Sequence, residues 1–510
     1  MANKKVSELT ALDYSDGNEE LIVNDGGISK KITQADLLDC HHPTSTSSLG
    51  VGRLTLDNNT GTSNTAVGYT ALRYNTTGEK NTALGYRTLL NNTTGHRNIC
   101  VGHDSMFTNT TGYYNTAIGY QTLYFNTTGK YNVAVGMQSL FNNTTANGNT
   151  AVGYTALYRN TGNNNSALGY AALKDNTTGV SNTALGYNAL LYNTTGIYNN
   201  ATGYKALYYN TTGSRNTADG LQSLYNNTTG YENVANGYRA LFYNTTGRYN
   251  AAVGSDSLNY NTTGSYNNAF GYQALFDNST GERNNAFGYL ALGNNTTGER
   301  NNAFGHASLY ANTTGIYNNA YGYTALYSNT TGSYNTAVGY YSMYNNTTGL
   351  NNTALGYSAL STTTTGQNNT GLGYNADASS AATNNEITLG NSSVATLRCN
   401  VTTITSLSDE RDKDNIQDLD AGLEFINNLR PVRFDWNMRD GGKVGVNDTG
   451  FIAQELQSAQ QTTGVQIPNL VMDENPDKLE AGYGTLVPVL VQAVKELTAR
   501  VQQLEKQLQG

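Results

Sequence analysis

The chain has 510 residues, and its composition lies far from the globular average, with 55 Gly, 39 Tyr, one Trp and only 13% charged residues. Disordered chains usually carry high net charge and few aromatic residues, so this abundance of periodically placed Tyr indicates an ordered fold. The net charge is -8 and no basic stripe interrupts the sequence. A nucleic-acid partner is therefore not expected.

Three cysteines, Cys40, Cys100 and Cys399, lie far apart, and their odd number argues against a disulfide framework. Lys4 and Lys5 are followed by no apolar segment, so the N-terminus does not read as a secretion signal. No run approaches the roughly 18 apolar residues that span a bilayer. We expect a protein that is made in a cytoplasm and stays soluble there, with no membrane insertion and no cofactor.

Residues 1–44 are expected to form a small N-terminal segment. Residues 20–23 and 28–32 read as two strands around the glycine-containing turn Asn24–Gly27. Thr33 is placed to cap a short helix that runs through Leu38.

Residues 40–42, Cys-His-His, raise the question of a metal site. A single cluster without a second ligand pair is more typical of a polar linker, so no metal is predicted. Residues 45–63 are assigned to the linker that follows.

The rest of the chain is dominated by a repeat that can be aligned on a central glycine. This glycine recurs every 17 residues from Gly68 to Gly373, with one shortened repeat before Gly169. A fixed period of this length is typical of a solenoid, in which each coil buries its apolar face against its neighbours. The sequence therefore predicts a mainly β fold, a parallel β-solenoid of about 19 coils over 64–375. Residues 376–407 are expected to cap it with short strands at 386–390 and 394–398.

Three positions in the repeat hold side-chain type or size within narrow limits. The residue four before the glycine is Asn from Asn64 to Asn369, and the residue two before it is nearly always Ala, with Cys100 and Gly371 as small substitutes. The residue four after the glycine is Leu or Met. We assign the Ala and Leu positions to the close-packed interior and interpret the Asn position as a structural ladder.

The position just before the central glycine is variable, because it holds aliphatic residues early, then Thr202, Asp219 and Asn236, then Phe or Tyr. Such a position is not a tight interior. Two interpretations remain open, an interchain surface with the polar triplet as a wet or ion-holding layer, and plain solvent exposure.

The repeated Asn-Thr-Thr also matches a glycosylation sequon at Asn75, Asn126, Asn193 and Asn244. In a chain without a secretion signal, turn chemistry is the better interpretation. Ranks of Thr can also suggest ice binding, but Thr placed in Asn/Gly turns beside variable Tyr does not predict a flat lattice.

Two segments resemble known families. Residues 6–12 and 22–33 resemble the start of tailed-phage fibre proteins, which implies a segment that docks to the virion tail or baseplate. The segment Asn64–Leu72 resembles the head repeat of trimeric autotransporter adhesins, which implies a left-handed parallel β-roll of three chains. The coil here is longer than in that family.

From Ser408 the composition becomes charged, and three blocks occur in order, at 408–416, 429–436 and 450–456. As a set they closely resemble the S74 self-cleaving chaperone domain of endosialidase-type tail fibres. The resemblance covers 408–510 and implies a small α+β domain that assembles a homotrimer and then cleaves itself off at the Leu407–Ser408 bond.

The same resemblance implies the roles of four residues. Ser408 is the nucleophile and Lys413 the general base, because a serine hydroxyl needs a neighbouring base, such as a desolvated lysine, to take its proton. Asp409 and Arg411 are expected to orient this dyad. The reaction is a single turnover on the chain's own backbone, so no activity on external substrates is expected.

Apolar residues at alternating spacings of three and four predict a coiled coil over 487–508, with Arg500 and Glu505 placed for an interchain ion pair. Val at a with Leu at d favours two strands, whereas the family is trimeric, and we follow the family. The alternative is a lone amphipathic helix on a globular core.

These features together predict a viral tail fibre, located in the virion, whose solenoid binds a host surface glycan or protein. A bacterial trimeric adhesin is one alternative, and a glycan- or ice-binding solenoid without cleavage is another. An enzyme acting on polysaccharide is disfavoured because the repeats contain no recurring carboxylate pair.

Overall fold

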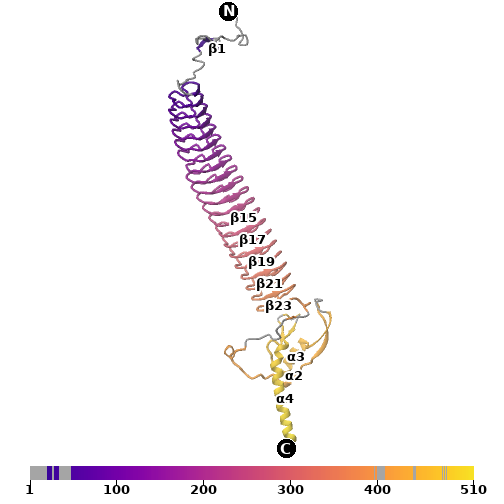
Figure 1. The fold of residues 1–510 in the computed structure, drawn as a ribbon. Coiled ribbons are helices and arrows are strands. Elements are labelled where there is room, and N and C mark those ends of the chain that lie inside the picture. Colours follow the sequence, from indigo (N-terminus) through magenta and orange to yellow (C-terminus); the bar gives the residue numbers. More distant parts are fainter. Residues whose placement is uncertain are drawn as a thin grey trace. The chain divides into compact units, whose positions relative to one another are not determined.

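The computed structural model describes residues 20–25, 28–33, 47–394, 397–398, 408–439, 444–473, 475, 477 and 479–509. The chain divides into two compact units, 1–299 and 300–510, and each is described by itself. The fold is mainly β: a parallel β-solenoid of about 20 turns with a period of about 17 residues, then a small α+β region that ends in a helix (Figure 1). The predicted fold class is confirmed.

Near the N-terminus, β1 (Glu20–Asp25) and β2 (Ile28–Thr33) pair antiparallel, with Glu20 opposite Thr33 and Asp25 opposite Ile28. This pairing confirms the two predicted strands. The predicted helix that ends at Leu38 and the Cys-His-His cluster at 40–42 lie outside the described residues.

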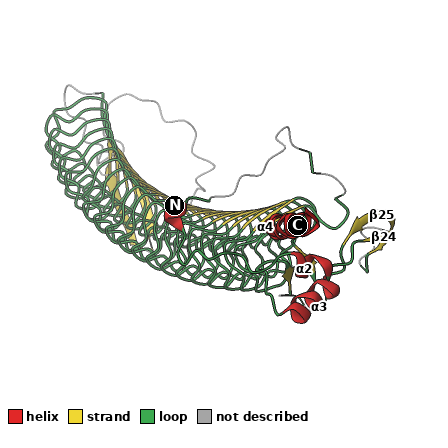
Figure 2. Ribbon diagram, turned by 90° about the horizontal axis from the view of Figure 1, so that it is seen from below, coloured by secondary structure: helices red, strands yellow, loops and turns green. Residues whose placement is uncertain are grey.

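The described part of the first unit contains fifteen three-residue strands, and consecutive strands within this unit pair with one another in parallel and in register. Figure 2 shows the strands on one side of the coils, while turns and loops form the other sides. The strands are β3 (Leu49–Val51), β4 (Thr65–Val67), β5 (Thr82–Leu84), β6 (Ile99–Val101), β7 (Thr116–Ile118), β8 (Val133–Val135), β9 (Thr150–Val152), β10 (Ser166–Leu168), β11 (Thr183–Leu185), β12 (Asn200–Thr202), β13 (Thr217–Asp219), β14 (Val234–Asn236), β15 (Ala251–Val253), β16 (Asn268–Phe270) and β17 (Asn285–Phe287).

The second unit continues the pattern with strands that pair in the same parallel register. They are β18 (Asn302–Phe304), β19 (Asn319–Tyr321), β20 (Thr336–Val338), β21 (Thr353–Leu355), β22 (Thr370–Leu372) and β23 (Ile387–Leu389).

The ends of the repeat differ from the sequence-based boundaries. β3 lies inside the stretch 45–63 that was assigned to a linker, and it pairs with β4. The stacked strands therefore begin one coil earlier than predicted. β23 confirms the strand predicted at 386–390. In the second predicted cap strand, Val394, Leu397 and Arg398 lie in no strand, and residues 395–396 are outside the described residues.

The interior of each coil is built from the three predicted columns. Side chains of the Ala and Leu columns are buried, with Cys100 and Met106 replacing them in one coil at 0% exposure. The Asn ladder is also buried: Asn216 Nδ2 donates to Gly230 O at 2.8 Å, and the Asn216 backbone N donates to Asn199 Oδ1 at 3.0 Å. Most of these Asn side chains therefore bond to backbone groups of the neighbouring coils, as a buried polar side chain must, while Asn149 Nδ2 has no partner among the described residues.

A second Asn ladder, seven residues after each central glycine, was not predicted as interior. Asn210 is fully buried, and its Nδ2 donates to Gly213 O at 2.9 Å and to Asn193 Oδ1 at 2.7 Å. Asn75, Asn126, Asn193 and Asn244, which match the sequon, belong to this column. Their amides are hydrogen-bonded inside the folded coil, so the motif is turn chemistry.

The backbone of the coil uses left-handed conformations in residues that usually avoid them. Leu207 and Lys205 have φ of 51° and 54°, and the equivalent residues of other coils repeat these values. The central glycine has no alternative residue: Gly203 has φ +129°, and a Cβ there would lie 2.5 Å from Gly220 O of the next coil. This close approach explains why the glycine recurs in every coil.

The variable column before the central glycine points outward from the strands. Leu185 and Phe270 are 44% and 36% exposed, while the Ala before each is buried. Thr202, Asp219 and Asn236 occupy three successive positions of this outer row, aligned by strand pairing. Within one chain the row is a surface, as the sequence indicates.

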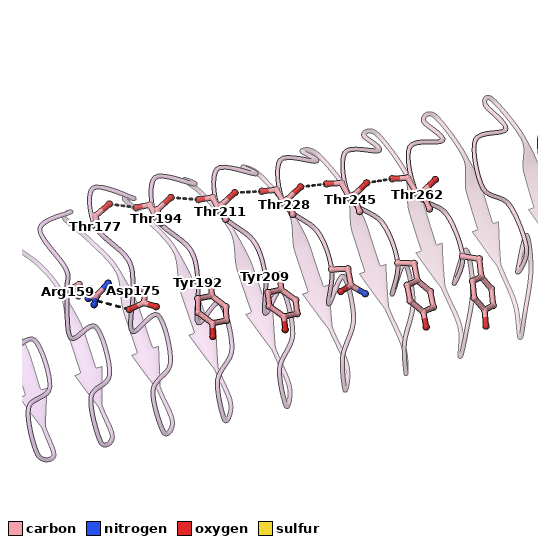
Figure 3. A pocket seen from close by; sticks show the side chains of 13 residues that line it. Arg159, Asp175, Thr177, Tyr192, Thr194, Tyr209, Thr211, Thr228, Thr245 and Thr262 are labelled. Carbon is pink, nitrogen blue, oxygen red and sulfur yellow. Dashed lines mark hydrogen bonds and ion pairs between the residues drawn. The ribbon is translucent and has the colours of Figure 1, made fainter.

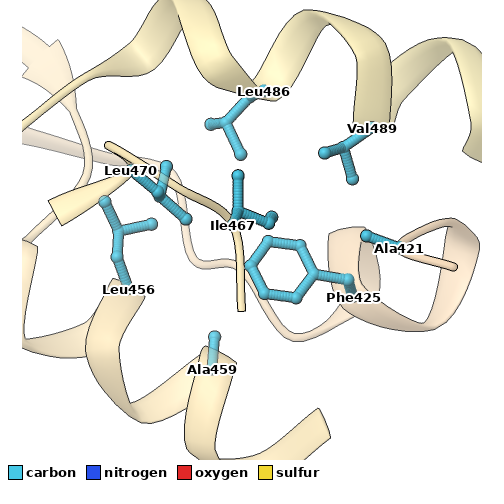
Figure 4. Packing of buried hydrophobic residues seen from close by; sticks show 8 residues of the cluster. All are labelled: Ala421, Phe425, Leu456, Ala459, Ile467, Leu470, Leu486 and Val489. Atoms are coloured by element: carbon cyan, nitrogen blue, oxygen red, sulfur yellow. The ribbon is translucent and has the colours of Figure 1, made fainter. Parts of the chain in front are cut away.

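The C-terminal region combines short helices and small antiparallel pairs. β24 pairs with β25, and β26 pairs with β27. Its core is the cluster Ala421, Phe425, Leu456, Ala459, Ile467, Leu470, Leu486 and Val489 (Figure 4). The elements are η2 (Glu410–Asp412), α2 (Leu423–Asn427), β24 (Val432–Asn437), β25 (Val444–Gly450), α3 (Ala453–Thr463), β26 (Val471–Met472), β27 (Glu480–Ala481), η3 (Tyr483–Thr485) and α4 (Leu486–Gln509).

Candidate functional site: a serine and lysine turn and an exposed helix

The segment from Ser408 to Lys413 folds into a tight turn around the 3-10 helix η2. Asp409 is its N-cap residue, and its Oδ1 accepts a hydrogen bond from the backbone N of Arg411 at 2.9 Å. Asp is a favoured N-cap because its carboxylate satisfies a backbone N–H at the start of a helix. The backbone N of Lys413 closes the turn by donating to Glu410 O at 3.1 Å.

A second contact holds Asp409 and Arg411 together. Arg411 Nε donates to Asp409 Oδ1 at 3.0 Å and Nη2 to Oδ2 at 2.5 Å, which makes a bidentate ion pair. The hydrogen bonds from Arg411 lower the pKa of the Asp409 carboxyl. The pair therefore stays ionised at neutral pH and braces the turn.

This turn brings together the two residues expected to react. Lys413 Nζ lies 2.6 Å from Ser408 Oγ and 3.5 Å from Ser408 O. A hydroxyl and an amine at this distance have the geometry of a nucleophile and its general base. Leu407, which would supply the other side of the cleaved bond, lies outside the described residues.

The four predicted site residues are all exposed to solvent in the single chain: Ser408, Asp409, Arg411 and Lys413. A serine and lysine dyad works best when the lysine is removed from water, because desolvation favours its neutral form. The single chain thus brings the two side chains together without the desolvation. The side-chain hydrogen bonds of Asp409 and Arg411 join these two residues to each other, and their expected role in orienting the dyad stays a prediction.

Helix α4 has two different faces. Leu486 and Val489 lie in the core, Ala493 is buried beside them, and the Glu496 carboxylate accepts a hydrogen bond from the backbone N of Leu423 at 2.7 Å, which ties α4 to the start of α2. The heptad side chains on its other face are 45% to 87% exposed. They are Val487, Leu490, Val494, Leu497, Val501, Leu504 and Leu508.

An apolar row of this length on a monomeric helix marks an interaction surface. The helix predicted over 487–508 is confirmed. The coiled coil stays a prediction, because a second chain would have to supply it.

Across the described ranges, His, Cys, Asp and Glu side chains form no group of three or more that could hold a metal ion. Among the same residues, no helix combines the length and hydrophobicity needed to cross a bilayer.

A groove runs along the coils between residues 159 and 262, and it was not predicted from the sequence. The signal was present in the sequence: the residue six after the central glycine is Tyr at 192, 209, 243 and 260, and varies elsewhere.

One family of known proteins matches the part of the chain that contains this turn. Residues 408–472 match the peptidase S74 family, described as the chaperone of endosialidase. No curated protein and no solved structure matches the chain. The match begins at Ser408, the residue whose hydroxyl meets Lys413. An endosialidase chaperone-type region that follows a β-solenoid fits a phage tail-fibre-like protein.

Proposed function

We propose that this chain is a phage tail-fibre protein whose residues 408–510 act as an intramolecular chaperone and then cleave themselves off. The observation that carries the proposal is the 2.6 Å contact between Lys413 Nζ and Ser408 Oγ at the first residue of the family match. The N-terminal residues dock to the virion tail or baseplate, and the solenoid attaches the virion to a glycan or protein of the host surface.

The chaperone is needed because the coils are nearly identical. Three chains could stack with their coils offset by one or more repeats, since each offset buries similar surfaces. The exposed heptad row of α4 supports assembly, because its residues form one apolar seam at coiled-coil spacing. Aligning three copies of α4 sets the register of the coils.

The outer row of the strands supplies a second contact in this proposal. The partners of the exposed aliphatic and aromatic side chains are the same row in the other two chains. Thr202, Asp219 and Asn236 then form one polar layer in an otherwise apolar contact, which disfavours any offset that places Asp219 against Leu or Phe.

Cleavage follows as an attack on the chain's own backbone. Lys413 takes the proton of Ser408 Oγ, and Oγ adds to the carbonyl carbon of Leu407. The Leu407–Ser408 peptide bond breaks, the proton passes to the freed amine of Ser408, and water hydrolyses the resulting ester. Because Lys413 is exposed in the single chain, the neighbouring chains of the trimer provide the desolvation, so assembly precedes cleavage.

The test is to express the wild type beside Ser408→Ala and measure masses under denaturing conditions, with Ser406→Ala as the matched control. The wild type and the control should lose a fragment of about 11 kDa, at about 110 Da per residue. Ser408→Ala should stay intact. An intact wild type in a properly assembled trimer would overturn the cleavage mechanism.

A further inference from the structure

A groove of about 840 Å³ runs across the coils of the first unit, between residues 159 and 262 (Figure 3). It lies between two columns of the repeat, the sixth and eighth residues after the central glycine. Both columns belong to turn segments, whereas the strands lie before the glycine. If other chains cover the outer row of the strands, they therefore contact residues other than those that line the groove.

One wall of the groove is a row of threonines. The Thr194 hydroxyl donates to Thr211 O at 3.0 Å, Thr211 to Thr228 O at 3.1 Å, and the row continues in the same way from Thr177 to Thr262. Each of these hydroxyl groups thus donates its proton to a backbone oxygen of the next coil. What the row offers a ligand is a series of hydroxyl oxygens that accept hydrogen bonds, one per coil.

The other wall is a column of tyrosines with one interruption. Tyr192 stacks on Tyr209 with ring centroids 5.5 Å apart, and Tyr243 stacks on Tyr260 at 5.0 Å. Asn226 occupies the same position of the repeat in the coil between these two pairs and also lines the groove.

The missing ring leaves a slot in this wall. Two coil steps of about 4.8 Å put the rings of Tyr209 and Tyr243 about 10 Å apart. A slot of this width accepts one further six-membered ring, at carbon contacts of about 3.5–4.0 Å on either side.

Asn226 forms the base of this slot. Its Nδ2 donates to Phe242 O at 3.0 Å, which holds the side chain across the junction of two coils. Among the described residues, none donates a hydrogen bond to its Oδ1. The slot therefore combines two aromatic walls with an available acceptor.

The groove has little charge. Arg159 and Asp175 form an ion pair of 3.6 Å at one end, so each neutralises the other. From Thr177 to Thr262 the lining residues are Tyr, Thr and Asn alone. A groove of this kind gives an anionic polymer no unpaired cation to bind.

We propose that this groove binds a neutral oligosaccharide, with one pyranose ring held between Tyr209 and Tyr243 above Asn226. A pyranose has apolar C–H faces for aromatic walls and peripheral hydroxyls that donate to the Thr oxygens and to Asn226 Oδ1. The inference rests on the proposed attachment role of the solenoid, and it names the site and the ligand class.

The experiment is affinity electrophoresis of the full-length protein in native gels that contain dextran, mannan, galactan or a β-glucan, with heparin as the anionic comparison. Asn226→Tyr fills the slot with a ring and completes the stacked column. Tyr243→Asn removes one wall. Tyr74→Asn changes the same column outside the groove and is the control. The column already holds Asn91, Asn142 and Asn226, so the coil accepts Asn at this position.

At least one neutral polysaccharide should retard the wild type and the control, and both slot variants should weaken this binding at least tenfold. Retardation by none of the neutral polysaccharides would overturn the proposal. So would binding unchanged in Asn226→Tyr, equal retardation by heparin, or a change of oligomeric state in Asn226→Tyr, which would make the groove an interchain contact.

The proposed function has a separate readout. If the protein adsorbs to host cells and still does so as Asn226→Tyr, the attachment role stands and the groove proposal fails. If the wild type binds a neutral polysaccharide but is never cleaved, the groove stands and the chaperone mechanism fails.

Discussion

The coils and the C-terminal region specify structure in opposite ways. In the coils, hydrogen bonds between neighbouring coils mostly join residues 14 to 17 apart, and most coils repeat the same contacts. In the C-terminal region, the link between Leu423 and Glu496 spans 73 residues and occurs once. A repeated contact defines each coil well but leaves the offset between chains undefined, whereas a unique contact defines one alignment.

The two regions also differ in what they leave exposed. A coil buries both of its Asn columns, its Ala and its Leu within one chain. Helix α4 buries Leu486, Val489 and Ala493 and leaves its whole heptad row in solvent. Each coil thus fills its interior within one chain and exposes the outer row of its strands, whereas α4 exposes an apolar row at coiled-coil spacing in the single chain.

The largest expected effect breaks α4. Leu497→Lys places three charges in the seam of the proposed trimer and removes three leucines, each worth about 1.5–3 kcal/mol when buried, so the trimer should lose at least about 5 kcal/mol. Sedimentation should show a shift from trimers to monomers. The mass under denaturing conditions should show that cleavage is lost as well. Ala499→Lys, which is exposed outside the heptad row, is the control. A Leu497→Lys protein that is still a trimer would show that α4 does not hold the trimer together.

The next effect breaks a coil. Gly203→Ala should destabilise its coil by at least about 3 kcal/mol, because the residue has positive φ and its Cβ would lie 2.5 Å from Gly220 O. Hydrogen exchange should show faster opening of the coils on either side. Gly484→Ala in the C-terminal region is the matched control, because its Cβ would meet nothing within 4 Å. Equal effects of the two substitutions would contradict the packing of the coils.

A smaller effect is expected in the second Asn ladder. Asn210→Leu removes the bonds to Gly213 O and Asn193 Oδ1 and takes one of the two acceptors from the amide of Asn227, at a cost of about 2–3 kcal/mol. The exposed Asn345→Leu loses one bond to Ser361 O and should cost under about 1 kcal/mol. Thermal unfolding of the two variants gives the comparison, and a neutral Asn210→Leu would show that the ladder is dispensable.

The smallest effect concerns the turn at Ser408. Arg411 lowers the pKa of Asp409 in the folded chain. The stabilisation that the ion pair gives the folded turn is therefore fully present above the ordinary carboxyl pKa of about 3.9, and it is lost as the pH falls through the lowered pKa. In an NMR titration, Asp409 should titrate below its usual range, and Arg411→Gln should raise the midpoint. Because both side chains are exposed, the effect on stability is small and weakens in salt. An unchanged midpoint in Arg411→Gln would exclude the pair.

The sequence predicted the coils well because their physics is periodic. A buried position accepts few side chains, so the Ala and Leu columns show in the alignment, and Cys100 follows the same rule. The second Asn ladder was missed because Asn beside Gly also suits an exposed turn. The positive φ of Leu207 could not be predicted, since leucine usually avoids that region and only stacking on neighbouring coils imposes it.

The site at Ser408 was predicted from resemblance rather than from the residues alone. Ser and Lys five apart are common on surfaces, and nothing in their spacing shows that a turn capped by Asp409 brings them to 2.6 Å. The groove was missed for another reason: Asn226 gains meaning only when the rings of Tyr209 and Tyr243 are seen to flank it.

The most direct test of the account is the native mass of the full-length Ser408→Ala protein beside that of the mature wild type. Three intact chains are predicted for the variant, and three chains that each lack 408–510 for the wild type. Complete cleavage in a wild-type monomer, or a monomeric variant, would contradict the claim that the C-terminal region assembles the coils before it leaves.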